Sequence, residues 1–433
     1  MGKKPFSGEL PAFIVGFGFR SVSVLSTFFA SVLLARFLGP SNFGVYSFSL
    51  VALSFLAIFA QLGFPPLIIR ETSPDRHGLS VRVSAIWTLA LFLSVLCATL
   101  LYFSVMLACS FSDVCPIQAD VILGGFLIVP LIGLLQLLAA MIKGRHKVLL
   151  AQFSYDFVRP VSFLILISFV VFATDFQLTP LMGLQVFSVS AFLALTYSFF
   201  IARKSGLKIE SFSGLKNTSI KLRSCGFFML LALFQFANNN FDVFALTIFV
   251  PSAEVGVYRA IWQLNALVSF GLLALNQLIE PSIAYFAAKK DWAGLQGLVR
   301  KSARLVFGLA VPPAILFLFF GSEVVQLLFG KGFESGAVAL SILVCGQLAN
   351  TFFGSVGIIL NMSGYERIST FSMVFSSLLN VTLNLLLVPI FGIEGAAVAS
   401  SISVVIWNVV MAFFVYKKLG LVSLAIWPQS TGK

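Results

Sequence analysis

Charged residues stand inside several stretches of the sequence that are otherwise apolar, and these residues have the clearest capacity for chemistry. They are three arginines and two aspartates: Arg20, Arg159, Arg259, Asp156 and Asp242. A charge near the centre of a bilayer costs about 2.5 to 3.5 kcal/mol on insertion scales, so an ionisable group there is a functional candidate by default. A guanidinium group stays charged when partly buried and matches phosphate oxygens. If the three arginines converge in one cavity, we expect an anionic ligand such as a diphosphate.

Asp242 belongs to the most polar patch inside an apolar stretch. Gln235, Asn238 and Asn239 are expected on the same helical face, at intervals of three, four and seven residues. A carboxyl group in a low dielectric can exchange protons, so Asp242 is a candidate for binding a coupling proton or cation. Hydrogen bonding between helices is the structural alternative, and the sequence leaves both open.

Asp156 and Arg159 lie three residues apart, directly before Pro160. This spacing favours an ion pair along the surface of one helix, with the proline at a kink. As a carboxyl group inside an apolar stretch, Asp156 is also the second candidate for ion coupling.

Arg259 stands at the outer end of another predicted helix, where snorkelling to the membrane interface is the alternative to ligand binding. Asn380 forms a stripe with Ser376 and Asn384, one residue every four. Such a stripe suits either tight helix packing or the wall of a cavity. The candidate substrate-binding residues are therefore the three arginines together with three asparagines: Asn238, Asn239 and Asn380.

The composition predicts what must surround these residues. Of the 433 residues, 59% are hydrophobic and 10% are charged, against roughly a quarter charged in a soluble domain. A soluble core cannot hide that much apolar surface, so the solvent must be a bilayer. The net charge of +12 then reflects the cations of cytoplasmic loops, and we expect no nucleic-acid partner.

Twelve apolar runs are long enough to cross a hydrocarbon core about 30 Å thick. They lie near residues 12–38, 46–69, 84–108, 121–142, 149–172, 181–202, 226–250, 258–279, 303–320, 337–360, 368–388 and 395–416. The sequence thus predicts an all-α integral membrane protein of about twelve transmembrane helices.

Lysine and arginine gather at the N-terminus and in every second connection, as in cytoplasmic loops. This pattern predicts that both termini are cytoplasmic. The largest polar segment, 203–224, is expected to link an N-terminal lobe of six helices (1–202) to a C-terminal lobe of six (225–433). Within the second lobe, cations alternate with apolar residues near 287–304, which predicts an amphipathic helix on the anionic membrane surface.

The two halves are related by an internal repeat. The turn Phe37-Leu-Gly-Pro-Ser-Asn-Phe-Gly-Val-Tyr46 reappears as Phe249-Val-Pro-Ser-Ala-Glu-Val-Gly-Val-Tyr258, 212 residues later, and a weaker echo pairs the turns at Gly144 and Gly364. Related halves with an even number of helices form parallel repeats, which can rock around a shared central cavity. This is the architecture of a transporter.

Other chemistry has little support in the sequence. The five cysteines are scattered without metal-ligand spacing, and only Cys109 and Cys115 are placed to share an outer loop. A phosphate-binding loop, a pair of aspartates with nucleotide-metal spacing and a sizeable extramembrane domain are all missing. We therefore expect neither an enzyme nor a bound cofactor or structural metal.

Several short motifs resemble the Wzx-type polysaccharide flippases, which share the MOP superfamily with the MATE antiporters and the lipid II flippases. The resemblance covers nearly the whole chain. The segments that carry it are Ala35-Arg-Phe-Leu-Gly-Pro-Ser-Asn-Phe-Gly-Val-Tyr46, Gln61-Leu-Gly-Phe64, Arg70-Glu71, Val255-Gly-Val-Tyr258, Gly364-Tyr-Glu-Arg367 and Gly392-Ile-Glu-Gly-Ala-Ala397.

This resemblance implies two MATE-like lobes around a central cavity and alternating access, driven by proton or sodium antiport. It implies a cargo of undecaprenyl-diphosphate-linked oligosaccharide, moved from the cytoplasmic to the periplasmic leaflet of a bacterial inner membrane. By the same resemblance, Arg20, Arg159 and Arg259 would engage the cargo. The pathway's polymerase and chain-length proteins are further candidate partners.

A drug or metabolite antiporter of the MATE type is the alternative. Its usual cargo is cationic and favours an acidic cavity. Here two intramembrane aspartates stand against three arginines, and this balance favours an anionic cargo.

Overall fold

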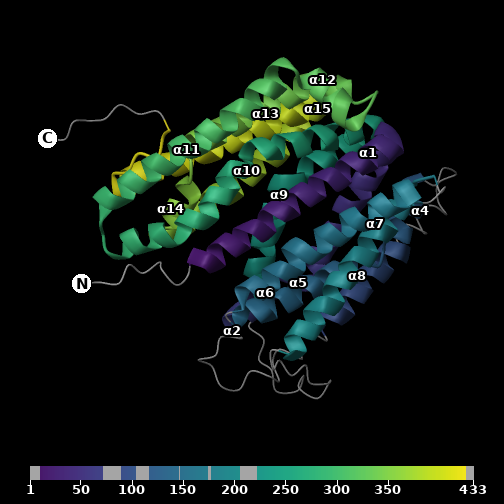
Figure 1. Cartoon of the computed structure of the whole chain (residues 1–433), viewed down its shortest axis with the longest axis horizontal. Coiled ribbons are helices and arrows are strands. Elements are labelled where there is room, and N and C mark those ends of the chain that lie inside the picture. The colour runs from purple at the N-terminus through teal and green to yellow at the C-terminus, as the bar shows by residue number, and fades with distance from the viewer. Residues whose placement is uncertain are drawn as a thin grey trace. The chain divides into compact units, whose positions relative to one another are not determined.

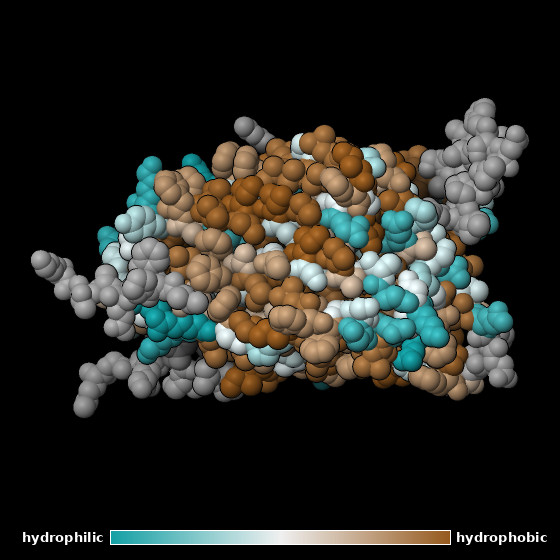
Figure 2. Space-filling model, turned by 90° about the horizontal axis from the view of Figure 1, so that it is seen from above, coloured by the Kyte–Doolittle hydropathy of each residue, from teal (hydrophilic) through white to brown (hydrophobic). Residues whose placement is uncertain are grey.

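The computed structural model describes residues 10–71, 89–103, 117–145, 147–173, 177–204 and 222–425. Every regular element in these ranges is a helix (Figure 1). The predicted all-α membrane fold is therefore confirmed. Hydrophobic residues cover most of the middle of the face drawn in Figure 2, as expected of a surface in contact with lipid.

The chain forms two compact units, unit 1 (Met1–Leu233) and unit 2 (Phe234–Lys433). They divide within helix α9 (Leu222–Phe249), whereas the sequence placed a linker at 203–224. Residues 205–221 of that linker lie outside the described ranges, as do Cys109 and Cys115.

Unit 1 begins with one long helical run that contains two predicted spans. Its described helices are α1 (Leu10–Gln61), α2 (Phe64–Glu71), a helix over Leu89–Phe103, α4 (Ile117–Gly124), α5 (Ile128–Gly144), α6 (Val148–Gln152), the π-helical turn η1 (Phe153–Val158), α7 (Arg159–Ala173) and α8 (Pro180–Lys204). Within α1 the chain kinks at Gly39, whose φ of 72° suits glycine, and Pro40 follows. This kink separates the spans predicted at 12–38 and 46–69.

The described part of unit 2 is also built from helices. After α9 come α10 (Ser252–Ala288), α11 (Trp292–Phe319), α12 (Gly321–Phe329), the short 3₁₀ turn η3 (Glu334–Gly336), α13 (Ala337–Phe353), α14 (Val356–Met362) and α15 (Glu366–Leu419). The last two predicted spans form α15, which kinks at Gly392 (φ 54°, ψ −129°). The backbone at Gly392 is not helical, so two helical segments meet there at a kink, and glycine tolerates the positive φ.

Seven of the described helices are long and apolar enough to cross a membrane, and two shorter apolar helices accompany them. Two of the seven, within α1 and α15, each contain two predicted spans joined by a kink. Helix α9 is not among the seven, because its polar residues lower its hydropathy.

The expected amphipathic surface helix near 287–304 differs in the structure. Helix α10 ends at Ala288, Asp291 caps the next helix by accepting a hydrogen bond from the Gly294 N–H, and α11 runs unbroken into the predicted span at 303–320. Leu295 and Val299 are buried in the core of unit 2. These apolar residues therefore pack against protein.

A segment after α15, residues 421–425, lies along unit 2, and we call it the C-terminal strap. The side chain of Gln296 in α11 donates to the Val422 carbonyl oxygen at 2.6 Å and accepts from the Val422 N–H at 2.8 Å. The Ala425 N–H donates to the Phe352 carbonyl oxygen of α13 at 3.0 Å. The strap therefore joins α11 to α13.

Candidate functional site

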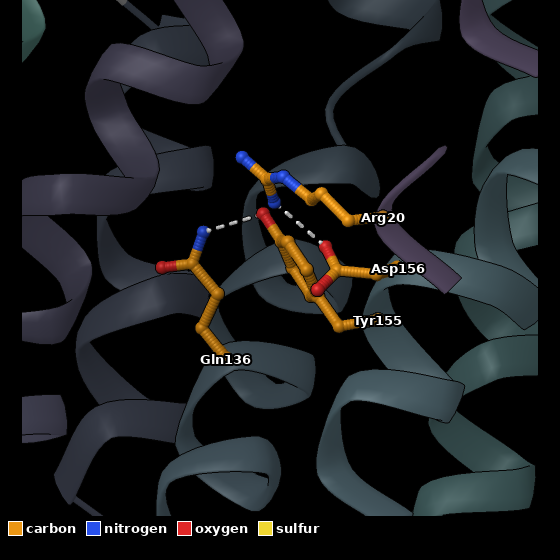
Figure 3. A network of polar contacts seen from close by, with 4 residues as sticks. All are labelled: Arg20, Gln136, Tyr155 and Asp156. Carbon is orange, nitrogen blue, oxygen red and sulfur yellow. Dashed lines mark hydrogen bonds and ion pairs between the residues drawn. The ribbon is translucent and has the colours of Figure 1, made fainter. Parts of the chain in front are cut away.

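Arg20 and Asp156 form an ion pair in unit 1, shown in Figure 3. The Arg20 Nη1 donates to Asp156 Oδ1 at 2.9 Å, which joins α1 to the η1 turn. The two side chains differ in exposure, at 42% for Arg20 and 11% for Asp156. The carboxylate is therefore buried, and much of the arginine side chain is open.

The η1 turn explains the partner of Asp156. Residues 153–158 are π-helical, and π-helical turns inside α-helices are frequent at functional sites. The wider turn changes the angle between Asp156 and Arg159, so the ion pair predicted within this helix is wrong. The carboxylate instead contacts Arg20, on a helix 136 residues earlier in the chain.

Arg159 lies over aromatic rings. Its guanidinium carbon is 4.5 Å from the centroid of the Tyr155 ring and 5.6 Å from that of Phe187. Its Nε is buried and has no hydrogen-bond partner among the described residues. The electron-rich ring faces partly replace the lost hydration of the cation. The guanidinium is thus held by stacking, which leaves its N–H groups for another acceptor.

Tyr155 is itself held by the neighbouring helix. The Gln136 Nε2 of α5 donates to the Tyr155 hydroxyl oxygen at 3.3 Å (Figure 3). Two consecutive residues of one turn therefore hold two arginines, Tyr155 through its ring and Asp156 through its carboxylate.

Asp242 occupies a different setting in unit 2. The Tyr258 hydroxyl donates to Asp242 Oδ2 at 2.7 Å, and the Val243 N–H donates to Oδ1 at 2.8 Å. Asp242 is 4% exposed and Tyr258 is fully buried. A buried carboxylate needs such donors, and here they are uncharged.

A chain of polar side chains continues from this pair to α15. Ser400 lies near the Tyr258 hydroxyl, and the Asn380 amide donates to Ser400 Oγ at 3.4 Å. The Asn384 amide in turn donates to Asn380 Oδ1 at 3.2 Å, and Asn384 Oδ1 is buried with no hydrogen-bond partner in the part of the chain that the structure describes. These carboxylate, hydroxyl and amide oxygens are the donor set that hard cations prefer. The described residues contain no cluster of three His, Cys, Asp or Glu side chains that would hold a metal ion.

The predicted polar face of α9 divides in two. Asn238 accepts a hydrogen bond from Ser376 at 3.5 Å, and it lies one turn before the buried Asp242. Gln235 and Asn239 are exposed. Asn238 and Asp242 are thus joined to α15 and α10, whereas Gln235 and Asn239 are accessible.

Arg259 lies in unit 2, where its guanidinium carbon is 5.0 Å from the Trp262 ring centroid. It is close enough to Asp242 for electrostatic attraction. Arg20 and Arg159 belong to unit 1. The convergence of all three arginines in one cavity stays a prediction.

A cavity of about 500 Å³ lies between α13 and α15. Its lining is Ser341, Ile342, Cys345, Gly346, Val398, Ser401, Ile402, Val405 and Ile406. The two serine hydroxyls donate to backbone carbonyls of α13. A lining without charge or free polar groups does not suit a diphosphate or a sugar.

Sequence reasoning did not identify Gln136, Tyr155 or Tyr258 as members of a site. Tyr258 closes the repeated turn, so the repeat was a usable signal for it. Gln136 and Tyr155 carry no such signal, because their meeting depends on the packing of α5 against η1.

Residues 16–284 match the family described as polysaccharide biosynthesis protein, and residues 228–386 match the MatE family. The first match covers more than half of the chain. The chain therefore belongs to the polysaccharide biosynthesis protein family, in agreement with the resemblance of its motifs.

Curated relatives support this membership. The chain is 24% identical over 222 residues to a probable low-salt glycan biosynthesis flippase, Agl15, of Haloferax volcanii, which is 48% of this chain and 47% of that protein. It is 23% identical over 392 residues to a putative O-antigen transporter of Shigella flexneri, covering 86% of this chain and 89% of the relative. The chain spans about half of Agl15 and about a third of AglR, a probable flippase of Haloferax volcanii.

Solved transporters share the fold. The lipid II flippase MurJ in an inward closed conformation superposes with a TM-score of 0.75 at 13% identity, covering 95% of this chain and 90% of MurJ. An inward-facing multidrug MATE transporter of the MOP superfamily gives 0.69 at 13% identity, over 94% and 98% of the two chains. The expectation of a MATE-like membrane fold is thereby confirmed.

Proposed function

We propose that this protein is a flippase that moves an undecaprenyl-diphosphate-linked oligosaccharide from the cytoplasmic to the periplasmic leaflet by alternating access. The observation that carries the proposal is the pair of arginines held by one π-helical turn, Arg20 and Arg159. Guanidinium groups whose N–H donors are not all used by the described residues suit the oxygens of a diphosphate. Membership of a polysaccharide biosynthesis family supports a glycan cargo.

The setting of the arginines favours a headgroup site. Arg20 is 42% exposed, so an anion can reach it without displacing the core. Arg159 keeps its charge on an aromatic surface. In this proposal Arg259, Asn238, Asn239 and Asn380 also engage the cargo, and the apolar tail of the cargo stays in the bilayer.

Ion coupling is assigned to the two aspartates. Asp242 has uncharged hydrogen-bond partners and a chain of oxygen ligands leading to α15, which suits a proton or a sodium ion. Asp156 sits against Arg20 and links the ion to the cargo. The protein is proposed to work in a bacterial inner membrane with both termini cytoplasmic, beside a polymerase and chain-length proteins.

A MATE-type cation antiporter is the second candidate, and the fold shared with multidrug MATE transporters favours it. Under that function Asp156 and Asp242 would bind the cargo. The two candidates predict opposite roles for the arginines, so one assay separates them.

The test is translocation of a fluorescent undecaprenyl-diphosphate oligosaccharide in proteoliposomes under an imposed proton or sodium gradient. Charge-assisted hydrogen bonds contribute about 1.5 to 3 kcal/mol each, so we expect Arg159→Ala to weaken cargo binding on the order of tenfold to a hundredfold. The exposed cation Lys301 supplies the matched control Lys301→Ala, which should transport at the parental rate.

Export of a cationic dye is measured in parallel. Gradient-dependent lipid movement without dye export supports the flippase. Dye export alone, with arginine variants that retain full activity, would establish the antiporter instead.

A further inference from the structure

We propose that Asp156 is an internal competitor of the cargo. Its carboxylate occupies Arg20 in the cargo-free protein, a phosphate group of the cargo displaces it, and its return to Arg20 helps to expel the cargo. This inference rests on the proposed function in one respect, namely that the cargo carries a diphosphate.

The ion pair has the geometry of a contact that can be exchanged. Arg20 has one hydrogen-bond partner among the described residues, through Nη1, although a guanidinium group has five N–H donors. With the Arg20 side chain 42% exposed, an incoming anion can approach the remaining donors before the carboxylate leaves. The phosphate group can therefore replace the Asp156 carboxylate without an intermediate in which Arg20 has no anionic partner.

The relative strengths favour displacement. The Asp156 carboxylate accepts one hydrogen bond from Arg20, through Oδ1. A phosphate group offers more charge and can accept two parallel hydrogen bonds from the same guanidinium. The phosphate group thus offers Arg20 more charge and more hydrogen bonds than Asp156 does.

The displaced carboxylate supplies the force for release. The Asp156 side chain is 11% exposed, and a buried carboxylate without its partner is disfavoured. Tyr155 precedes Asp156 on the same turn, Arg159 follows it three residues later, and Arg159 is stacked on the tyrosine ring. The cargo-bound state is therefore raised in free energy by the unpaired Asp156 carboxylate. Departure of the cargo restores the ion pair and removes this cost.

The internal repeat aligns neutral residues with both members of the ion pair. The repeat relates Arg20 to Ala232 at the offset of 212 residues set by the first turn. The pairing of Gly144 with Gly364 relates Asp156 to Ser376. The second half of the chain therefore has neutral residues at both positions, which favours a functional role for the charges in the first half.

The test uses the full-length protein in lipid nanodiscs with farnesyl diphosphate as the probe. Asp156→Asn keeps the side-chain volume and removes the competing charge, so we expect affinity to rise on the order of threefold to tenfold. Turnover of the fluorescent lipid-linked oligosaccharide in proteoliposomes should fall, because the variant releases the cargo more slowly. Asp156→Glu should restore part of both properties.

A purely structural role for Asp156 gives the opposite pattern, with weaker probe binding and slower turnover together. That pattern in Asp156→Asn, at a parental unfolding temperature, overturns the proposal, as does unchanged affinity. If Arg20→Ala leaves probe binding and flipping at parental levels, the proposed function itself fails at this site.

A second measurement needs no variant. An apolar carbodiimide reacts with a buried carboxyl group that has lost its ion pair, and mass spectrometry locates the adduct. Farnesyl diphosphate should increase the labelling of Asp156 in the parental protein. Equal or lower labelling with the probe would contradict displacement even if Asp156→Asn does not fold.

Discussion

The two intramembrane aspartates illustrate how the same residue type acquires different chemistry. Asp156 has a charged partner whose side chain is largely open, while Asp242 is enclosed by uncharged donors. The sequence identified both residues, because charges inside apolar stretches are conspicuous. It misassigned the partner of Asp156, because an α-helical spacing of three residues was assumed where the chain is π-helical.

At this scale we predict the effect of Tyr258→Phe. The variant removes the hydroxyl that donates to Asp242 at 2.7 Å and leaves a buried carboxylate one donor short. A lost partner of this kind costs about 1 to 3 kcal/mol, so the unfolding temperature in detergent should fall. Tyr416→Phe, at an exposed tyrosine, is the control, and equal unfolding temperatures for the two variants would contradict the prediction.

At the scale of elements, apolar runs were sufficient to place the helices, since lipid forces the chain to satisfy its backbone hydrogen bonds within each span. Kinks were harder to anticipate. Gly39 and Gly392 lie in turns that the motifs had drawn attention to, and the helical backbone is interrupted at both, but the sequence did not predict the angle between the segments on either side. Whether a glycine bends or ends a helix depends on packing that the local sequence does not encode.

Gly63 shows how tightly these elements meet. It links α1 to α2 with φ of 70°, and a Cβ atom there would lie 2.4 Å from the Cys225 carbonyl oxygen. We predict that Gly63→Ala lowers the yield of folded protein and the unfolding temperature, because both the backbone and the contact become strained. A Cβ atom at Gly226, in contrast, meets nothing within 4 Å. Gly226→Ala should therefore fold like the parent, and similar behaviour of the two variants would disprove the packing explanation.

At the scale of the whole molecule, the internal repeat and the distribution of cations predicted two related halves of a transporter. The structural similarity to MurJ and MATE transporters agrees with the expected fold. Contacts between side chains of distant segments could not be predicted from the sequence. Arg20 and Asp156 are 136 residues apart, and only three-dimensional packing brings them together.

The boundary between the units yields a prediction for a divided chain. Cys225, in the first turns of α9, is buried in a core cluster with Phe64 and Leu137 of unit 1. Fragments 1–212 and 213–433, expressed together, should therefore co-purify through a tag on the first fragment. Cys225→Asp places a charge in that core and should reduce recovery of the second fragment, whereas independent purification of the parental fragments would contradict the prediction.

The C-terminal strap has a consequence for the order in which the protein is built. Gln296 and Val422 are 126 residues apart, so α11 and α13 leave the ribosome well before the segment that joins them. These helices therefore lack the hydrogen bonds to the strap until α15 has been inserted into the membrane. Completion of this part of unit 2 is therefore a late event in biogenesis, during which a membrane chaperone would find the Gln296 side chain and the Phe352 carbonyl without their final partners.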